Sequence, residues 1–386
     1  METQAGSMSF QTNAEHEAIR KAVREFGAEE LRPVAREHDE EGKYPADLRR
    51  QAAELDFVAP HVPEEYGGAG MDMLGRVIVT EELWRADPGL GSAIGSAGFG
   101  SSMILEYGDE WMKEEWLTRI AAGESASSTC ISEPAHGSNV AGMETTAEKD
   151  GDEYVIDGNK MWITNGTVAD VAVVMAKTDP GAGHRGITAF LVPTDLEGYE
   201  PTKIDNKLGI RASDLAEIQL NGVRVPEDNV IGTKDKGFYQ LMDFFASGRT
   251  GVAAQAVGAA QGALDVALDY AGEREQFDQK IGEFQAIRHK LADMATDTEA
   301  ARSLTYRAAG AVEAGKDDQA VKLASMAKYF SSETSVDVAD ESIQVHGGSG
   351  YVSDYPAERF YRDARITKIY EGTSEIQKNI IADRLL

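Results

Sequence analysis

Several features are scarce in this chain, and each scarcity narrows what the protein can be. A single cysteine, Cys130, stands among 386 residues, which excludes an intrachain disulfide and leaves no sulfur pair for a zinc site. No stretch approaches the roughly 18 uninterrupted apolar residues of a membrane-spanning helix. Residues 1–12 lack the basic start and apolar centre of a signal peptide. We therefore expect a cytoplasmic protein that does not enter a membrane.

Basic residues are also scarce, with 38 Lys and Arg against 66 Asp and Glu and a net charge of −28. This balance argues against binding nucleic acid or an anionic membrane through a broad basic surface. The acidic residues occur in every segment, which favours a solvated surface layer over a site for one basic partner. Because salt screens self-repulsion, we state a halophile-like acidic surface as a hypothesis.

The common signatures of nucleotide, metal and hydrolase sites are missing. No Gly-x-Gly-x-x-Gly follows a predicted strand, and no Walker-type phosphate loop is present. The seven histidines show no metal-ligand spacing, so we expect no metal site. A Ser-His-Asp hydrolase would also need the Gly-x-Ser-x-Gly elbow, which is absent.

The residue pattern divides the chain into a helical, a β and a second helical part. Residues 1–126 predict an N-terminal α-helical domain, and 127–232 carry short alternating β-branched runs that predict a central antiparallel β-domain. Residues 233–386 predict long, alanine-rich helices packed in a C-terminal bundle. The pairs Asp157-Gly158 and Asn221-Gly222 predict hairpin turns. The expected fold class is α+β multidomain.

Three residues of the β region could meet a ligand. Ser132 lies in "CISEPAHGS", where hydroxyls and free N–H groups can bind a polar ring edge or a phosphate. Trp162 and Thr164 stand two residues apart in "KMWITNG", on the same face of a predicted strand. The pattern is equally consistent with a tryptophan that packs in the core.

Two stretches of the C-terminal part also allow a ligand. Arg274 and Phe277 are three apart, on one helix face or its turn, and such a pair can hold a pyrophosphate. Helix spacing alone favours an Arg–Glu surface pair instead. Gln344 and the pair Gly347-Gly348 permit close approach of a ligand, or a plain helix C-cap.

Near the end of the chain, "YEGTSEIQ" breaks the helical pattern. Ser374 and Gln377 fit a capping box, which predicts that a final helix starts at Ser374 and buries Ile376 and Ile380. Glu371 lies three residues earlier, in a loop. It can be a partner of the helix dipole, or a buried base with a raised pKa, and the spacing does not decide between them.

Taken together, these stretches resemble the acyl-CoA dehydrogenase family over nearly the whole chain. The resemblance rests on five motifs in the family's order: "SEPAHGSNVAGMETTA", "DGNKMWITNG", "LGIRASDLA", "EREQF" and "QVHGGSGY", the last continuing to "YEGTSEIQ". It implies an N-terminal α-domain, a central β-domain and a C-terminal four-helix bundle, assembled as a homotetramer (a dimer of dimers). It also implies FAD bound without a Rossmann fingerprint, with electrons passed to an electron-transfer flavoprotein.

The resemblance implies roles for particular residues. Those expected to contact FAD from the β-domain are Ser132, Trp162 and Thr164. Those expected to reach the FAD of a neighbouring subunit are Arg274, Gln276, Phe277, Gln344 and Gly348. Thr373 and Glu375 would touch the cofactor from the bundle side. Residues expected to hold the acyl-CoA substrate are Ser138, Arg249, Tyr370 and Gly372, and the small residues Gly95 and Gly98 would leave room for its acyl tail.

Glu371 matches the catalytic base of the short- and medium-chain branch of the family. There the carboxylate removes the α-proton of an acyl-CoA thioester, the β-hydrogen leaves as hydride to the flavin, and the product is a trans-2-enoyl-CoA. The thioester oxygen is polarised by the Glu N–H and a flavin hydroxyl, an oxyanion-hole arrangement. Another branch carries its base on a bundle helix just before the residue equivalent to Arg249, but Gly248 stands there. The reaction class would serve fatty acid β-oxidation or amino acid catabolism.

The chain also departs from the family pattern. His136 and Asp278 stand where the family usually has small residues, and Gln276 and Glu375 lie at variable cofactor contacts. For His136 we favour a side chain that points to solvent over one that adjusts substrate preference. The alternatives to a dehydrogenase are an acyl-CoA oxidase using O2, which the compact length disfavours, and a non-catalytic flavin-binding relative.

Overall fold

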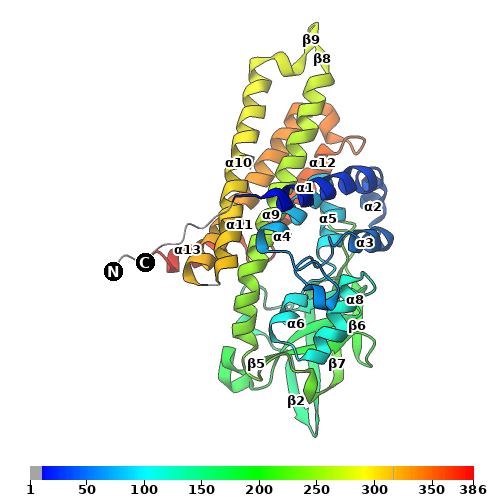
Figure 1. Ribbon diagram of the computed structural model, residues 1–386, viewed down its shortest axis with the longest axis vertical. Coiled ribbons are helices and arrows are strands. Elements are labelled where there is room, and N and C mark those ends of the chain that lie inside the picture. Colours follow the sequence, from blue (N-terminus) through cyan, green and yellow to red (C-terminus); the bar gives the residue numbers. More distant parts are fainter. Residues whose placement is uncertain (1–10, 316) are drawn as a thin grey trace.

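The computed structural model describes residues 11–315 and 317–386, and it divides along its long axis into helices and a sheet (Figure 1). Most of the segment 1–12, in which no signal peptide was expected, lies outside the described residues. The predicted fold class is confirmed: helices, then a β-domain, then long helices. The boundaries 1–126, 127–232 and 233–386 stay a prediction. Within the described residues no helix is both long and apolar enough to cross a lipid bilayer.

The N-terminal part is made of short helices. Their bounds are α1 Ala14–Phe26, α2 Ala35–Glu41, α3 Ala46–Ala53, α4 Met73–Ala86, α5 Pro88–Gly95, α6 Ser101–Tyr107, α7 Glu110–Met112 and α8 Thr118–Ala121. Helix α1 begins after Asn13, whose Oδ1 accepts the His16 N–H at 2.9 Å and caps the helix. Val23 and Phe26 are buried on its inner face, as their helical spacing predicts.

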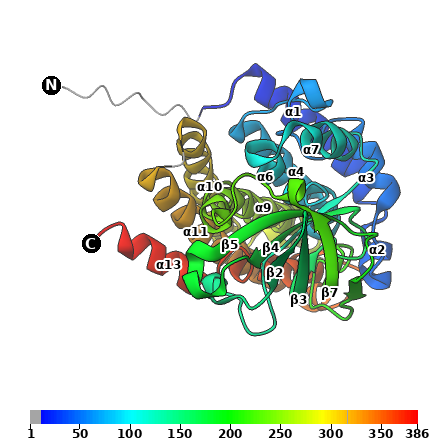
Figure 2. The same ribbon diagram turned by 90° about the horizontal axis from the view of Figure 1, so that it is seen from below.

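The strands of the β-domain form one seven-stranded sheet within the described residues. Their bounds are β1 Ser127–Cys130, β2 Thr146–Asp150, β3 Glu153–Thr164, β4 Val171–Lys177, β5 Ile187–Pro193, β6 Tyr199–Lys203 and β7 Leu215–Pro226. Strands β2–β3, β3–β7, β6–β7 and β4–β5 pair antiparallel, whereas β1 pairs parallel with β4. Seen along the long axis, the sheet lies in front of the helices α9 and α11 (Figure 2).

Two glycine pairs that were predicted as hairpin turns lie instead inside the long strands β3 and β7. The register of β3 against β7 shifts between Ile156 and Gly158, where Asn221 and Gly222 of β7 stand opposite Asp157 alone, so the β-bulge lies on β7. In this bulge Gly222 has φ +67° and its N–H donates to Asp157 Oδ1 at 2.8 Å. The prediction was wrong because a left-handed glycine suits a bulge as well as a turn. The turn between β2 and β3 uses Gly151.

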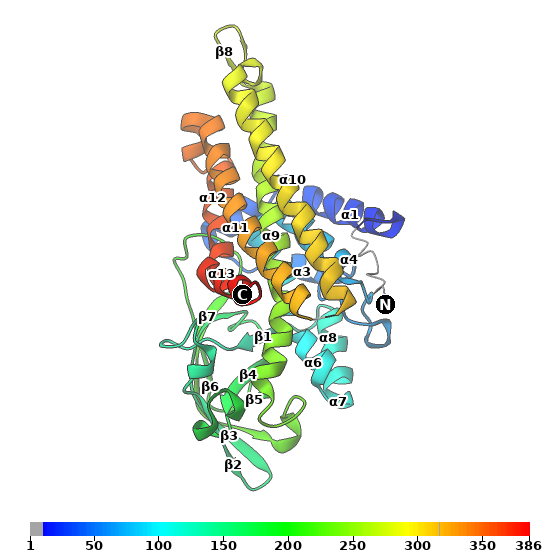
Figure 3. The same ribbon diagram turned by 90° about the vertical axis from the view of Figure 1, so that its left-hand side faces the viewer.

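The C-terminal part is built on three long helices. The bounds are α9 Gly237–Glu273, β8 Glu275–Gln276, β9 Gln279–Lys280, α10 Gln285–Ala314, α11 Asp318–His346, α12 Ala357–Ala364 and α13 Ser374–Asp383. Strands β8 and β9 form a hairpin that joins α9 to α10 and projects at the end of the molecule opposite the sheet (Figure 3). We refer to residues 274–280 as the tip hairpin.

Small residues let other helices approach α9 closely. A Cβ on Gly258 would lie 2.2 Å from the Glu81 carbonyl oxygen of α4. A Cβ on Gly262 would lie 2.4 Å from the Phe360 ring of α12. These contacts fix α9 against α4 and α12, and α9 also carries part of the candidate site described below.

We expect Gly258→Ala to destabilise the protein by about 1–3 kcal/mol, because its methyl group would overlap a backbone carbonyl and force the helices apart. Gly272→Ala is the matched control on the same helix, since its Cβ would meet nothing within 4 Å. The control should be neutral, or more stable by up to about 1 kcal/mol through helix propensity. Chemical denaturation of both variants makes the measurement, and equal stabilities would contradict close packing at Gly258.

Candidate active site

Glu371 lies in a tight turn between a short helical segment, Arg365–Lys368, and α13. Its backbone is left-handed at φ +52°, and Gly372 follows at φ +89°. For a non-glycine residue this conformation costs on the order of 1–2 kcal/mol, so the surrounding structure must hold it. The carbonyls of the turn accept hydrogen bonds from Lys328 Nζ and Gln377 Nε2.

The start of the last helix differs from the predicted capping box. Thr373 is the N-cap, and its Oγ1 accepts the Ile376 N–H at 3.4 Å. Ser374 Oγ instead donates to Glu333 Oε1 at 2.8 Å. The predicted burial of Ile376 and Ile380 is wrong, since both are only half-buried. The buried residues of this helix are Ser374, which bonds Glu333, and Gln377, which bonds the turn.

The carboxylate of Glu371 is buried although part of the residue reaches the surface. Its Oε2 is buried and has no hydrogen-bond partner among the described residues. Burial raises the pKa of Glu371 to about 7, against the charges of Arg249 and Lys328, which lower it. Burial therefore outweighs the favourable charges, and the side chain has the acidity of a base that works near neutral pH.

Gly248 provides the space that this carboxylate occupies. A Cβ on Gly248 would lie 3.1 Å from Glu371 Oε2. Position 248 of α9 therefore faces the Glu371 carboxylate directly, and it is the position where we expect another branch of the family to carry its base. A longer side chain at position 248 would compete with Glu371 for the same space.

Arg249 and Tyr370, both expected near the substrate, flank Glu371. Arg249 of α9 is 7% exposed, and its Nε is buried without a partner among the described residues. Burial lowers the pKa of Arg249 to about 10, so it stays charged at neutral pH. Tyr370 donates its Oη proton to Gln255 Oε1, and burial raises its pKa well above the usual value.

On the β-domain, Ser132 and the end of β3 lie together. The Met161 N–H donates to the Ser132 carbonyl at 2.9 Å, next to a bulge that separates Lys160 from Ile163. Trp162 in this bulge has φ +62° and is 58% exposed, so it does not pack in the core. Thr164 is half-buried and Ile163 is buried.

A buried ion pair that the sequence reasoning missed supports this region. Lys160 Nζ donates to Glu133 Oε1 at 2.9 Å, and both residues are buried. Glu133 Oε1 also accepts the Thr145 N–H at 3.0 Å and its hydroxyl at 2.5 Å. Burial would raise the pKa of Glu133, but Lys160 and these donors lower it to about 2. Sequence spacing gave no signal for this pair, because Glu133 and Lys160 are 27 residues apart.

The loop after Glu133 carries two further candidates. Ser138 is exposed. His136 does not simply point to solvent as we favoured: its side chain is 21% exposed, and its Nε2 lies 3.6 Å from Glu144 Oε1. A Cβ on Gly142 would lie 2.8 Å from His136 Nδ1, so the ring packs on that glycine. Of the two small residues assigned to the acyl tail, Gly95 faces open space, whereas a Cβ on Gly98 would lie 2.8 Å from Ala59.

The remaining candidates lie at the far end of the molecule. Arg274, Gln276 and Phe277 belong to the tip hairpin rather than to one helix face, and Phe277 is 87% exposed. Phe277 and Asp278 both have positive φ, as in a two-residue hairpin turn of type I′. Gln344 and Gly348, both exposed, lie at the end of α11, where Gly347 is the predicted C-cap.

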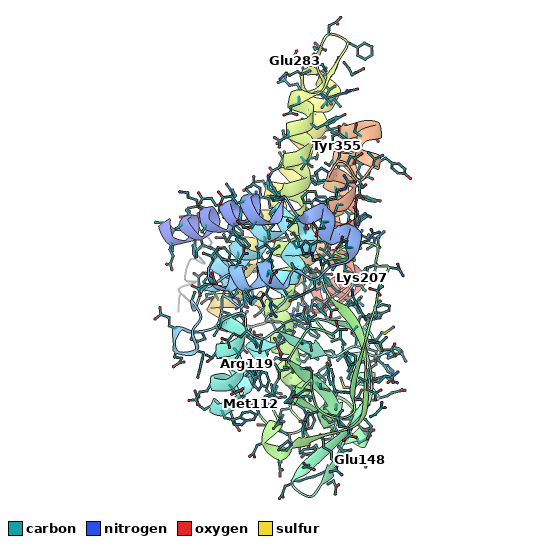
Figure 4. The ribbon with its side chains drawn as sticks, turned by 90° about the vertical axis from the view of Figure 1, so that its right-hand side faces the viewer. Met112, Arg119, Glu148, Lys207, Glu283 and Tyr355 are labelled. Atoms are coloured by element: carbon teal, nitrogen blue, oxygen red, sulfur yellow. The ribbon has the colours of Figure 1, made fainter. Side chains whose placement is uncertain are left out.

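The predicted residues therefore fall into separate groups. Figure 4 labels Glu283, beside the tip hairpin, at one end of the molecule and Glu148 of β2 at the other. Trp162 belongs to the sheet, while Glu371 lies next to α13, where the bundle meets the β-domain (Figure 3). The tip residues do not come together with Trp162 or Glu371 within one chain. Glu375 is exposed at the start of α13.

Comparison with known proteins gives consistent matches along the chain. Family models for the acyl-CoA dehydrogenase N-terminal, middle and C-terminal domains match residues 13–124, 128–223 and 235–386. The short-chain specific acyl-CoA dehydrogenase of Bos taurus mitochondria is 42% identical over 96% of this chain and 90% of that protein. The butyryl-CoA dehydrogenase of Megasphaera elsdenii is 36% identical, with a TM-score of 0.93 over 98% of this chain and 99% of that one.

A chain in the structure described as the electron transferring flavoprotein of Acidaminococcus fermentans is 38% identical, with a TM-score of 0.94 over 98% of this chain and 99% of that one. The fold and these matches define an oxidoreductase of the flavoprotein class. The chain belongs to the acyl-CoA dehydrogenase family.

The length argument against an oxidase does not hold. A prolyl acyl carrier protein oxidase is 32% identical, with a TM-score of 0.92 over 97% of this chain and 100% of that one. An oxidase of this family can therefore have the same compact length.

We expect Lys160→Met to destabilise the protein by about 3–5 kcal/mol, because it leaves the Glu133 carboxylate buried without its cation. Lys160→Met combined with Glu133→Gln should recover much of this loss. Lys149→Met is the matched control, since its pair with Glu227 is half-exposed and worth less than about 1 kcal/mol.

The same pair predicts a pH dependence of stability. The folded pKa of Glu133 is depressed from 4.5, so its stabilising effect is present above about pH 4.5 and is lost as pH falls toward 2. Urea unfolding between pH 2 and 7 should show this acid loss in the parent and less of it in the double variant. Identical acid profiles would show that the pair does not stabilise the fold.

Proposed function

We propose that the protein is an FAD-dependent dehydrogenase that converts an acyl-CoA thioester to its trans-2-enoyl-CoA, with Glu371 as the base. The observation that carries the proposal is the Glu371 carboxylate, whose Oε2 is buried without a hydrogen-bond partner among the described residues and whose pKa is raised to about 7 by burial. A carboxylate in this state is poised to accept a proton near neutral pH. Gly248 leaves it the space, and no second carboxylate stands at that position.

In this reaction Glu371 accepts a proton, and the residues around it stabilise its charge and orient its side chain. Glu371 is ionised above about pH 7 and takes the α-proton of the thioester. The charges of Arg249 and Lys328 stabilise the ionised carboxylate and keep its pKa from rising further. The left-handed turn orients the Glu371 side chain toward Gly248 of α9.

The β-domain residues fit FAD. Trp162 is a large aromatic side chain that is exposed and held in a strained backbone conformation, which the packing of the chain alone does not require. Its exposed ring, with Ser132 and Thr164 close by, would hold the flavin, with Thr373 and Glu375 on the bundle side. When bound, FAD accepts the β-hydrogen as hydride. Ser138, Arg249, Tyr370 and Gly372 would hold the acyl-CoA.

The tip hairpin supports a shared cofactor site. Arg274, Gln276 and Phe277 are exposed at the end of the molecule that lies opposite the sheet, so they would serve the FAD of a neighbouring subunit in a homotetramer, together with Gln344 and Gly348. We further infer a cytoplasmic enzyme that passes electrons to an electron-transfer flavoprotein.

A second candidate function is an oxidase with O2 as the acceptor, which the match to an oxidase of equal length favours. The reduced enzyme distinguishes the two. We expect slow reoxidation in air and fast reoxidation by an added electron-transfer flavoprotein, followed by flavin absorbance. Fast reoxidation by air alone would assign the oxidase.

We expect Glu371→Gln to retain FAD and to lose at least about 10³-fold in the rate of flavin bleaching by an acyl-CoA, because the amide cannot accept the α-proton. The measurement is anaerobic stopped-flow absorbance with a panel of acyl-CoAs. Glu148→Gln is the matched control, since that carboxylate is exposed on β2 and has no role in the proposed site, and it should retain the rate of the parent. Retained bleaching in Glu371→Gln would place the base elsewhere, and no bleaching by any acyl-CoA in the parent would indicate a non-catalytic relative.

A further inference from the structure

Two buried polar side chains from two different helices hold the backbone of the Glu371 turn. Lys328 of α11 is fully buried and its Nζ donates to the Gly372 carbonyl at 2.7 Å. Gln377 of α13 is also fully buried, and its Nε2 donates to the carbonyls of Glu371 and Gly372 at 3.0 and 2.9 Å. Figure 3 shows α13 beside α11 at the level where the bundle meets the β-domain.

The turn depends on such support because two successive residues are left-handed. Glu371 has φ +52°, a left-handed backbone conformation that glycine adopts readily but that is unfavourable for most residues with a side chain. A Cβ on Gly372 would lie 2.6 Å from Gln377 Nε2, so Gln377 also fills the space that Gly372 leaves open. The Gln377 Oε1 is buried without a partner among the described residues, a cost that the two donated bonds offset.

Lys328 differs from Gln377 in that it also brings a charge. A fully buried ammonium group is unfavourable unless a nearby anion compensates it. Burial lowers the pKa of Lys328 to about 8, against Glu371, the anion that raises it most. In return, Lys328 and Arg249 lower the pKa of Glu371, which burial raises.

We propose that Lys328 and Gln377 are positioning residues for Glu371: both hold its turn, and Lys328 alone also sets the charge balance at its carboxylate. The proposal rests on the function proposed above for Glu371. The charged groups that face Glu371 are Arg249 from α9 and Lys328 from α11, with Tyr370 adjacent in the chain. Farther out, the charges that act on these two cations are Arg384, Glu333 and Glu375.

The two residues should therefore give different responses to substitution. Lys328→Met and Gln377→Leu should each slow flavin bleaching by about 10- to 100-fold, because a displaced base no longer meets the α-proton. Only Lys328→Met should move the midpoint of the pH–rate profile, upward by on the order of one pH unit, because it removes a cation near the carboxylate. Lys328→Arg should restore the midpoint of the parent enzyme.

The matched control is Lys322→Met, which removes a lysine from the same helix at a half-buried position away from the turn. It should change neither the rate nor the midpoint. If Lys328→Met fails to fold, Lys328→Gln removes the charge and keeps a donor for the Gly372 carbonyl. That variant should show the raised midpoint with a smaller loss of rate.

A readout that does not depend on turnover separates this inference from the proposed function. Difference infrared titration, with Glu371→Gln as the reference, follows protonation of the Glu371 carboxyl directly in the FAD-loaded enzyme. We expect its midpoint to be higher in Lys328→Met than in the parent and unchanged in Gln377→Leu, with the flavin content unchanged in both. An unchanged carboxyl midpoint in Lys328→Met, or an equal displacement in Gln377→Leu, would overturn the inference. Retained bleaching in Glu371→Gln would instead overturn the function of Glu371.

Discussion

The burial of one carboxylate oxygen, Glu371 Oε2, without a hydrogen-bond partner among the described residues is the constraint on which the rest of the site depends. Water would stabilise Glu371 as an ordinary surface acid, and a hydrogen bond to its charged form would do the same. Glu371 Oε2 is buried from water and has no hydrogen-bond partner among the described residues. The buried side chains of Arg249 and Lys328 are the positive charges that stabilise the ionised carboxylate. The outcome of these opposed effects is a pKa of about 7, which suits a base that must accept a proton and later release it.

The fold meets this constraint by bringing three helices to one turn. Helix α9 contributes Arg249 and the space beside Gly248, α11 contributes Lys328, and α13 contributes Gln377. Close packing of α9 against α4 and α12 through small residues makes that geometry rigid. The sheet carries its own strained residue, Trp162, on a bulge beside the buried pair of Lys160 and Glu133. The left-handed residues Glu371 and Trp162 thus each have buried charged or polar side chains next to them.

Periodicity and composition predicted the order of helices and strands, and ordered motifs predicted the family, because both depend on local residue type. Local sequence patterns gave wrong or undecided predictions where contacts between distant segments determine the conformation or the pKa. Asn221-Gly222 has the residue types of a turn but forms a β-bulge inside β7. Ser374 has those of a cap but donates a hydrogen bond to Glu333, while Thr373 caps the helix. Spacing alone left Glu371 undecided, because its pKa depends on burial by helices that are distant in the sequence. Lys160 and Lys328 were missed since a buried lysine looks like a surface lysine in a sequence.

The central claim is that Glu371 takes the α-proton with a pKa near neutrality. The most direct test is deuterium exchange at the α-carbon of an acyl-CoA held by the anaerobic enzyme in D2O, followed by NMR from pH 5 to 9. We predict exchange that rises with pH through about 7 as Glu371 ionises, and that is lost in Glu371→Gln. Exchange that persists in Glu371→Gln, or that does not vary with pH in the parent enzyme, would contradict this account.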